Sequence, residues 1–320
     1  MILKFALLII KSIMPELPEV QTTVNILNKK IKGLFILDVW TDYNSKFYKG
    51  KGNIKNPKYF EIFKKEILNK KILGVERRAK NILINVSGNS NQRQADKTIL
   101  VHMKMTGKLL YGKYEFSAKK WSPVNDIYLS DPFNRFIHLV FSLSDGKHLV
   151  LSDTRKFAKV FVFNTEDKKE LEDLRKLGPE PLDKSFTFKI FKDRLMLKQN
   201  GKIKTVLMDQ EIISGIGNIY SDEVLWMSGI RPDKKVSEIS ETELKKLFEN
   251  VKKVLVLSIK VGGDSMSDYR NPLGRKGGYQ DLHKVYRKTG TSCTFHGCFG
   301  IIKRKIIGGR SSHYCDCHQK

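Results

Sequence analysis

The sequence predicts an α+β chain in three parts: a β-sandwich or barrel with a flanking helix, a helical domain, and a small C-terminal hairpin. Three observations predict it. Short apolar runs separated by Gly, Asn and Asp turns fill the first half. Apolar residues at helical spacing follow in the second half. All four cysteines lie in the final stretch 293–320, a concentration typical of a metal-binding unit.

The first element is a helix, because Val20, Val24, Leu27 and Ile31 recur at helical spacing and Gly33 interrupts the pattern. The runs predicted to be strands are Leu34–Trp40, Ile72–Arg77, Ile82–Val86, Ile99–Met103, Ile137–Leu143, Leu149–Ser152 and Val160–Phe163. Two polar stretches, Asp42–Lys58 and Tyr111–Arg135, are predicted to be loops or insertions between strands.

The pattern changes at Gly178-Pro179-Glu180-Pro181, where we place a linker. Helices are expected at Phe188–Leu197, Val206–Ile213 and Ile219–Met227, and a capping box of Ser240 and Glu243 opens a long one that ends at Gly262-Gly263. Residues Asp264–Tyr279 are polar and glycine-rich, which favours a mobile loop. The expected parts are an extension at 1–13, a β domain at 14–176, a linker at 177–184, a helical domain at 185–280 and the hairpin at 281–320.

The charge balance points to a polyanionic partner. The chain has 320 residues, with 59 Lys+Arg against 34 Asp+Glu and a net charge of +25, and such an excess destabilises a compact chain by self-repulsion. Nucleic acid is the first candidate partner and an anionic membrane the second. A lysine-rich codon bias is the alternative, but the charge is patterned: no Asp or Glu occurs from Leu282 to Cys315.

Residues 1–13 contain one short apolar run, Phe5–Ile10. Six apolar residues cannot span a bilayer, and neither a long apolar core nor a small-residue cleavage site marks a secretory signal. We therefore expect translation to begin at Met14, and a cytoplasmic, nucleoid-associated monomer that does not enter membranes.

The cysteines have the spacing of zinc ligands. Cys293 and Cys298 form one close pair, and Cys315 follows after a hairpin-length spacer. His318 and Cys317 compete for the fourth position, with His296 as a further candidate; the gap after Cys315 favours His318. The prediction is one structural Zn²⁺ held by Cys293, Cys298, Cys315 and His318. The alternative is a set of unliganded thiols.

Two other segments carry chemistry. Met14-Pro15-Glu16 offers a secondary amine beside a carboxylate if the chain is cut after Met14. With a positively charged clamp, such an amine suggests imine chemistry on a nucleic acid. Gly215-Ile216-Gly217-Asn218 is a tight turn into a helix, and exposed amides at such a position bind phosphate. A purely structural turn is equally compatible with that segment.

Taken together, these segments resemble the formamidopyrimidine-DNA glycosylase family, which is related to endonuclease VIII. The resemblance lies in MPELPEV (14–20), RRAKNIL (77–83), LVHMKMTGKL (100–109), SDTRKFAKVF (152–161), LGPEPL (177–182), IKTVLMDQEIISGIGNIYSDEVL (203–225), SGIRPD (228–233) and GIIKRKIIGGRSSHYC (300–315). It implies an N-terminal β-sandwich, a helix–two-turn–helix domain with a lesion loop, and a zinc finger, with damaged double-stranded DNA in the cleft between them.

The resemblance also implies roles. Pro15, as a free N-terminus, matches the nucleophile that forms a Schiff base, and Glu16 the group that handles protons at the sugar. Lys80 matches the lysine linked to β-elimination, and Arg310 the arginine linked to δ-elimination. The residues that match DNA-binding positions are Lys204 and Asn218 at phosphates and Met105, Arg155 and Phe157 in the space left by the flipped nucleotide. Glu19 and Glu223 match carboxylates near the site.

Each of these residues has a plainer interpretation. Lys80 and Lys204 could be solvated lysines of a basic chain, and Met105 and Phe157 could be core. The sequence also departs from the family pattern. Thr154 and Ala158 replace an expected proline and glycine, His318 stands where the last cysteine usually falls, and the loops at 42–58 and 111–135 look longer.

The implied function is base-excision repair: a glycosylase and abasic-site lyase for oxidised purines, 8-oxoguanine and formamidopyrimidines. Two alternatives stay open at this point. One is an endonuclease VIII-like enzyme for oxidised pyrimidines, and the other is a DNA-binding homologue without catalysis.

Overall fold

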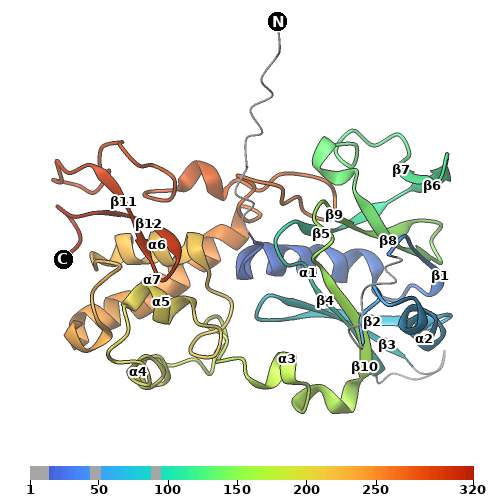
Figure 1. Cartoon of the computed structure of the whole chain (residues 1–320), viewed down its shortest axis with the longest axis horizontal. Coiled ribbons are helices and arrows are strands. Elements are labelled where there is room, and N and C mark those ends of the chain that lie inside the picture. Colours follow the sequence, from blue (N-terminus) through green and yellow to red (C-terminus); the bar gives the residue numbers. More distant parts are fainter. Residues whose placement is uncertain (1–13, 44–51, 88–94) are drawn as a thin grey trace, which may run out of the picture.

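The computed structural model describes residues 14–43, 52–87 and 95–320, so the 1–13 extension and part of the 42–58 loop lie outside the described residues. Figure 1 shows two halves side by side, with the strands of the N-terminal half on one side and the helices of the C-terminal half on the other. No helix of the described residues is both long and apolar enough to cross a membrane.

The N-terminal half is a sandwich of two four-stranded antiparallel sheets, in the orders β1-β8-β9-β5 and β10-β4-β3-β2. The strands are β1 (Ile36–Thr41), β2 (Ile72–Arg78), β3 (Asn81–Ser87), β4 (Ala95–His102), β5 (Gly107–Gly112), β8 (Ile137–Leu143), β9 (His148–Asp153) and β10 (Lys159–Asn164). Buried side chains of both sheets form one core, as Leu139 and Ile84 illustrate. The predicted sandwich is confirmed.

Helix α1 (Leu17–Ile31) joins the two halves (Figure 1). Val20, Val24 and Leu27 pack into the sandwich core. Leu17, at the start of the same helix, belongs to the core of the helical half. A short turn ahead of α1 is therefore fixed by both halves at once, and Pro15 and Glu16 lie in that turn.

The helical half contains α4 (Phe188–Met196), α5 (Ile203–Met208), α6 (Asn218–Ser228) and α7 (Glu241–Lys260) around a second apolar core. Ser240 caps α7 and Glu243 returns to the Ser240 amide, as the sequence predicted. The predicted helix Val206–Ile213 was wrong at both ends. It begins at Ile203 and ends at Met208, because Asp209 is extended and its side chain accepts from the Glu211 amide.

The elements missed in the N-terminal half include α2 (Pro57–Ile67) and β5. The predicted loop 111–135 contains a hairpin, β6 (Tyr114–Ser117) with β7 (Lys120–Pro123), and a turn of 3-10 helix, η1 (Pro132–Asn134). Near the linker, 3-10 helix η2 (Thr165–Lys169) precedes α3 (Glu172–Arg175). In the helical half the short 3-10 helices are η3 (Val236–Glu238) and η4 (Tyr279–Leu282).

The chain ends in the hairpin of β11 (Ile302–Ile307) and β12 (Arg310–Cys315). The tight turn between them is Gly308-Gly309, and both residues have positive φ, which glycine adopts without strain. A side chain at Gly308 would also meet Thr205 of α5 at 2.4 Å. The turn therefore seats the hairpin on the helical half and presents Arg310 at its tip.

Candidate active site

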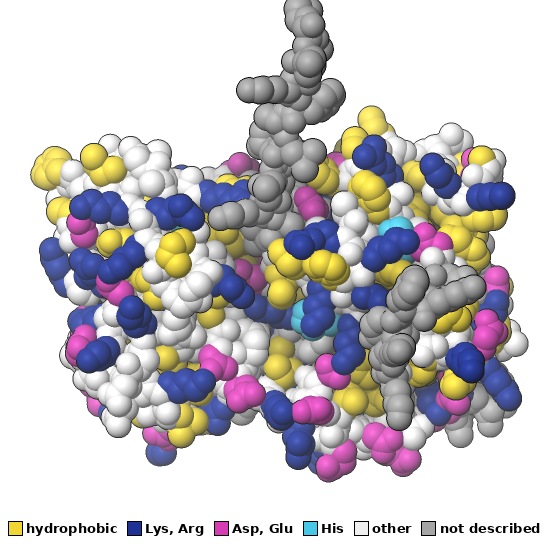
Figure 2. All heavy atoms as spheres, in the orientation of Figure 1, with side chains coloured by type: hydrophobic (Ala, Val, Ile, Leu, Met, Phe, Trp, Pro, Cys, Tyr) yellow, Lys and Arg dark blue, Asp and Glu magenta, His cyan; other side chains and the backbone are white. Residues whose placement is uncertain are grey.

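A cavity of about 1250 Å³ lies where the two halves meet. Figure 2 shows Lys and Arg side chains spread over both halves of the face drawn there. Of the residues predicted to act on DNA, those that line the cavity are Glu16, Lys80, Met105, Arg155, Asn218 and Arg310. Residues from the two ends of the sequence therefore share one space.

Glu16 reaches from the turn before α1 to the start of α6. Its Oε1 accepts a hydrogen bond of 2.9 Å from the Ile219 amide, and Oε2 has no hydrogen-bond partner among the described residues. A Cβ at position 217 would lie 2.4 Å from the Glu16 Cδ, so a larger residue there would displace the carboxylate. Burial raises the pKa of Glu16, although Lys80 and the amides of α6 oppose that effect.

This arrangement corrects one expectation. The amides at the α6 N-terminus were predicted to be an exposed phosphate site, but they face the Glu16 carboxylate. The Asn218 side chain lines the cavity: its Nδ2, the group that can donate to a phosphate, bonds the Tyr286 hydroxyl at 3.5 Å, and its Oδ1 has no partner within the described structure. Gln210, which sequence reasoning missed, shapes the turn: its side chain accepts from the Gly215 amide and donates to the Ile216 carbonyl.

Glu19 supports Glu16 from one turn into α1. Its Oε2 accepts from the Glu16 amide at 2.8 Å. Its Oε1 accepts from the Tyr220 hydroxyl at 2.5 Å and from the Asp264 amide at 2.7 Å. Burial raises the pKa of Glu19 to about 8 despite these donors. Glu19 therefore positions the backbone at Glu16, and it ties that backbone to α6 and to the segment after α7.

Lys80 lies in the tight turn between β2 and β3. Its Nζ donates to the Ile216 carbonyl at 3.1 Å, and burial lowers its pKa against the opposing effect of Glu16 and Glu19. The turn is pinned to the linker, since Arg77 and Arg78 both pair with Glu180, at 2.5 and 3.1 Å. A buried lysine with a lowered pKa is suited to proton transfer.

The three residues predicted to replace the flipped nucleotide form one cluster at the ends of neighbouring strands. The Arg155 guanidinium contacts the Met105 sulfur at 3.1 Å and lies 4.4 Å from the centre of the Phe157 ring. Phe157 is 46% exposed although it is apolar. Ala158, which departs from the family pattern, is buried and its amide donates to Asp153 at 2.7 Å. Alanine at position 158 is therefore compatible with a loop whose backbone is held by Asp153.

Lys204 does not reach the cavity. Its side chain is fully buried, and its Nζ lies 2.5 Å from Asp222 Oδ1 and 2.8 Å from the Ser311 carbonyl. Asp222 Oδ2 also accepts from the His313 amide at 2.9 Å. The direct phosphate contact expected from the sequence is therefore wrong for this structure, because the ammonium is already paired. Lys204 instead fixes β12, and with it Arg310, against α5 and α6.

We expect Lys204→Met to destabilise the protein by about 3–5 kcal/mol, because it leaves the Asp222 carboxylate buried without its cation. Urea unfolding measures this, with Lys202→Met, at an exposed position just before α5, as the control expected within about 0.5 kcal/mol. The double change Lys204→Met with Asp222→Leu should keep the salt dependence of DNA binding. If the slope of log affinity against log salt concentration were flatter by about 0.9 in that variant, Lys204 would contact a phosphate directly after all.

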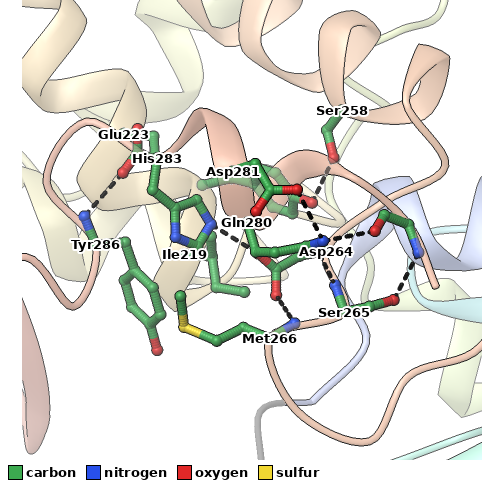
Figure 3. Close-up of polar contacts among 12 residues, drawn as sticks. Ile219, Glu223, Ser258, Asp264, Ser265, Met266, Gln280, Asp281, His283 and Tyr286 are labelled. Atoms are coloured by element: carbon green, nitrogen blue, oxygen red, sulfur yellow. Dashed lines mark hydrogen bonds and ion pairs between the residues drawn. The ribbon is translucent and has the colours of Figure 1, made fainter.

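Glu223, the other carboxylate singled out in the sequence, is not at the cavity wall. It accepts from the amides of Lys284, Val285 and Tyr286 at 2.8 to 3.0 Å, as Figure 3 shows for Tyr286. It therefore holds the chain that leads from α7 to the hairpin. Tyr286 and Arg287, which line the cavity beyond it, were missed because nothing in their spacing marks them.

The cysteine unit brings three thiols together. Sulfur atoms of Cys293, Cys298 and Cys315 lie within 4.8 Å of one another. His318 is not in this group: its Nε2 is 2.8 Å from the Trp226 carbonyl and its ring stacks on Phe295 at 3.6 Å. The choice of His318 as fourth ligand is therefore not supported by the structure, since stacking and hydrogen bonding already engage the ring.

A sandwich of two antiparallel sheets, a helical half with a turn aimed at a buried carboxylate, and a hairpin beside three clustered thiols define a two-domain DNA glycosylase of the helix–two-turn–helix type. The comparisons agree. Residues 14–160 match the formamidopyrimidine-DNA glycosylase N-terminal domain and residues 177–270 the H2TH domain of the same enzymes. The chain belongs to the formamidopyrimidine-DNA glycosylase family.

Relatives and solved structures cover nearly the whole chain. The formamidopyrimidine-DNA glycosylase of Bacillus cereus is 33% identical over 94% of this chain and 98% of its own length. That of Pelotomaculum thermopropionicum is 34% identical over 96% and 99%. The Lactococcus lactis Fpg bound to abasic-site DNA aligns with a TM-score of 0.78 at 30% identity, over 95% of this chain and 99% of that one.

Proposed function

We propose that this protein is a base-excision repair enzyme that removes oxidised purines from double-stranded DNA and then cleaves the abasic strand. The observation that supports the proposal is the shared cavity, which is lined by Glu16, Lys80, Asn218 and Arg310 and by Met14, the residue before Pro15. A related Lactococcus lactis Fpg was solved with DNA containing FAPY-dG, and a MutM with DNA containing carbocyclic 8-oxo-G. The substrate proposed here follows those relatives.

In the proposed reaction the nitrogen of Pro15, freed as the chain terminus, attacks C1′ of the damaged nucleotide. The base leaves with the electrons of the glycosidic bond and takes up the proton that the Pro15 nitrogen loses, and the sugar ring then opens to an iminium ion on Pro15. Glu16 supplies a proton to the ring oxygen, a role that its raised pKa favours. Removal of the C2′ proton then expels the 3′ phosphate, with Lys80 positioned for proton transfer and Arg310 beside the remaining phosphate.

The cluster at Met105, Arg155 and Phe157 accounts for access to the base. A flipped nucleotide leaves a gap in the stack that costs a few kcal/mol. The exposed Phe157 ring and the guanidinium stacked on it provide a planar surface for that gap. A lesion-bearing duplex in the nucleoid is the substrate that this arrangement and the +25 charge favour.

The direct test is single-turnover excision on matched duplexes, one with 8-oxoguanine and one with an oxidised pyrimidine such as thymine glycol. The proposal requires faster release of the oxidised purine. Preference for the pyrimidine would favour the endonuclease VIII-like alternative. DNA binding without release of either base would favour the non-catalytic one.

We also propose that the thiol cluster holds one structural Zn²⁺ with Cys317 as the fourth ligand. Three thiolates in this geometry suit tetrahedral zinc. A Cβ placed on Gly300 would lie 2.5 Å from the Cys315 sulfur and 2.6 Å from the Cys317 Cβ, so Cys317 borders the cluster. Bound zinc would cross-link the hairpin and take no part in the chemistry.

Cys317→Ser should therefore lose bound zinc and weaken DNA binding, because the cross-link that supports Arg310 is lost. His318→Gln is the matched control and should keep about one zinc per chain. Metal content measured on both purified variants decides between them. Zinc retained in Cys317→Ser but lost in His318→Gln would return the fourth position to the histidine.

A further inference from the structure

The segment 113–135 connects β5 to β8 and leaves the sandwich. It packs against and is ion-paired with the loop 264–279 that follows α7. At the centre of the contact is Arg270, whose side chain is only 2% exposed. Its Nε pairs with Asp131 Oδ2 at 2.9 Å, and its guanidinium lies 5.0 Å from the centre of the Phe133 ring. The arginine also donates to the carbonyls of Ser267 and Tyr269, at 3.1 and 2.8 Å, which folds the loop around it.

The backbone of the loop is held as well. The Tyr111 amide, at the end of β5, donates to the Pro272 carbonyl at 2.7 Å. Gly274 has a φ of +75° and packs so closely that a Cβ would lie 2.5 Å from the Tyr128 carbonyl. On the sandwich side, the buried Lys108 donates to the Phe133 carbonyl at 2.7 Å and anchors the segment. The predicted loop is thus bound to the other half of the molecule through side chains and backbone.

The first part of the same loop, from Asp264 to Tyr269, is hydrogen-bonded to Glu19 of the proposed catalytic motif. The Asp264 amide donates to Glu19 Oε1 at 2.7 Å, and the Tyr269 hydroxyl donates to the Glu19 carbonyl at 2.9 Å. Figure 3 shows Asp264 as a branching point that also bonds the Met266 amide and approaches His283. Glu19 in turn accepts from the Glu16 amide at 2.8 Å. Asp131 is therefore connected to Glu16, the residue beside Pro15, through Arg270, the loop around it and Glu19.

We propose that the Asp131–Arg270 pair is a latch by which the 113–135 segment positions the Glu16–Glu19 turn for catalysis. Asp131 and Arg270 are positioning residues, because they act through Tyr269 and Asp264 on Glu19 and neither of them lines the cavity. The latch restrains the 264–279 loop, so that the amide and hydroxyl that bond Glu19 keep their places during imine formation. The effect of the latch on catalysis rests on the proposed function, whereas its restraint of the 264–279 loop is independent of that function.

The test compares Asp131→Asn with Asp126→Asn in the full protein. The asparagine side chain at position 131 can still accept from the Phe133 amide, as the aspartate does at 2.9 Å, but it lacks the charge that Arg270 faces. Asp126 caps the same segment through the Tyr128 and Leu129 amides, and no ion pair to it occurs among the described residues. Gly274→Ala opens the contact by a second route, without a change of charge. Asp131→Glu restores the charge.

Two quantities are measured. Without DNA, hydrogen exchange of the 264–279 amides should become about tenfold faster in Asp131→Asn and Gly274→Ala, the scale of one lost charged hydrogen bond. Exchange in β3 and β4 should not change. With an abasic-site duplex at saturating protein, the rate of borohydride trapping should fall about five- to tenfold in the same two variants. The affinity for the abasic-site duplex should change less than the trapping rate. Asp131→Glu should recover most of the wild-type trapping rate.

Unchanged loop exchange in Asp131→Asn and Gly274→Ala would overturn the latch. Faster exchange with a trapping rate equal to that of Asp126→Asn would overturn its role in positioning the catalytic turn. Failure of the wild-type protein itself to trap abasic DNA would count against the proposed function and its catalytic consequence, while the exchange result would still decide whether the latch restrains the loop.

Discussion

Glu16→Gln should bind lesion-bearing DNA as tightly as the wild-type protein and release the damaged base about 10² to 10⁴ times more slowly. The amide is nearly the same shape as the carboxyl group, and its oxygen can keep the 2.9 Å hydrogen bond from the Ile219 amide. What it loses is the ability to give and take a proton. Binding isotherms and single-turnover excision on one 8-oxoguanine duplex measure the two effects separately.

Glu249→Gln is the matched control, since Glu249 is an exposed residue of α7 that does not line the cavity; its excision rate should equal that of the wild type. The pH dependence adds a second check. Because burial raises the pKa of Glu16, its protonated form persists to higher pH than for an ordinary glutamate, and excision should decline on the alkaline side as that proton is lost. Wild-type excision by Glu16→Gln would remove Glu16 from the mechanism.

The chain that begins at Pro15 should excise and trap DNA, whereas a chain that retains residues 1–14 should do neither, with a loss of about 10³-fold or more, as expected when a nucleophile is removed. In the longer chain the Pro15 nitrogen is an amide, and its lone pair is delocalised into the carbonyl group. It cannot form an iminium ion.

Two preparations with N-termini verified by intact mass provide the comparison, each assayed on the same abasic and 8-oxoguanine duplexes. Their affinities for undamaged DNA serve as the control, because the basic surface is common to both. Equal excision by a preparation that retains every one of residues 1–14 would exclude the Pro15 amine as the nucleophile.

The strands of the sandwich are the part of the fold that sequence alone predicts best. The pattern at Ile137–Leu143 predicts the observed ends of β8, because a mostly apolar run between turn signals is typical of a buried strand. The short run at 107–112 was missed, since two glycines frame it and it packs against β9 from a distant part of the chain. Helix α2 was missed because it opens with Asn56-Pro57, a pair that is also typical of a polar loop.

At the candidate site, too, sequence motifs identify some residues, whereas contacts between distant elements become visible only in the fold. Motifs identified Glu16, Lys80 and Arg310, and the structure places all three at one cavity. Sequence could not show that Lys204 is paired, since its partners Asp222 and Ser311 come from other elements. Nor could spacing decide between neighbouring residues at the metal, because the direction of the His318 ring depends on its contacts with two distant aromatic residues. The Arg270 latch lies in a stretch whose composition is merely polar and glycine-rich.

In the proposed reaction the Pro15 nitrogen becomes covalently bound to the sugar, and the site of that bond can be measured directly. The protein is mixed with an abasic-site duplex and borohydride, the adduct is digested with protease and nuclease, and the mass of the modified peptide is determined. We expect the reduced sugar to be attached to an N-terminal peptide that begins at Pro15. A sugar attached to a lysine, such as Lys80, or the absence of any adduct from a protein that still releases the base, would contradict it.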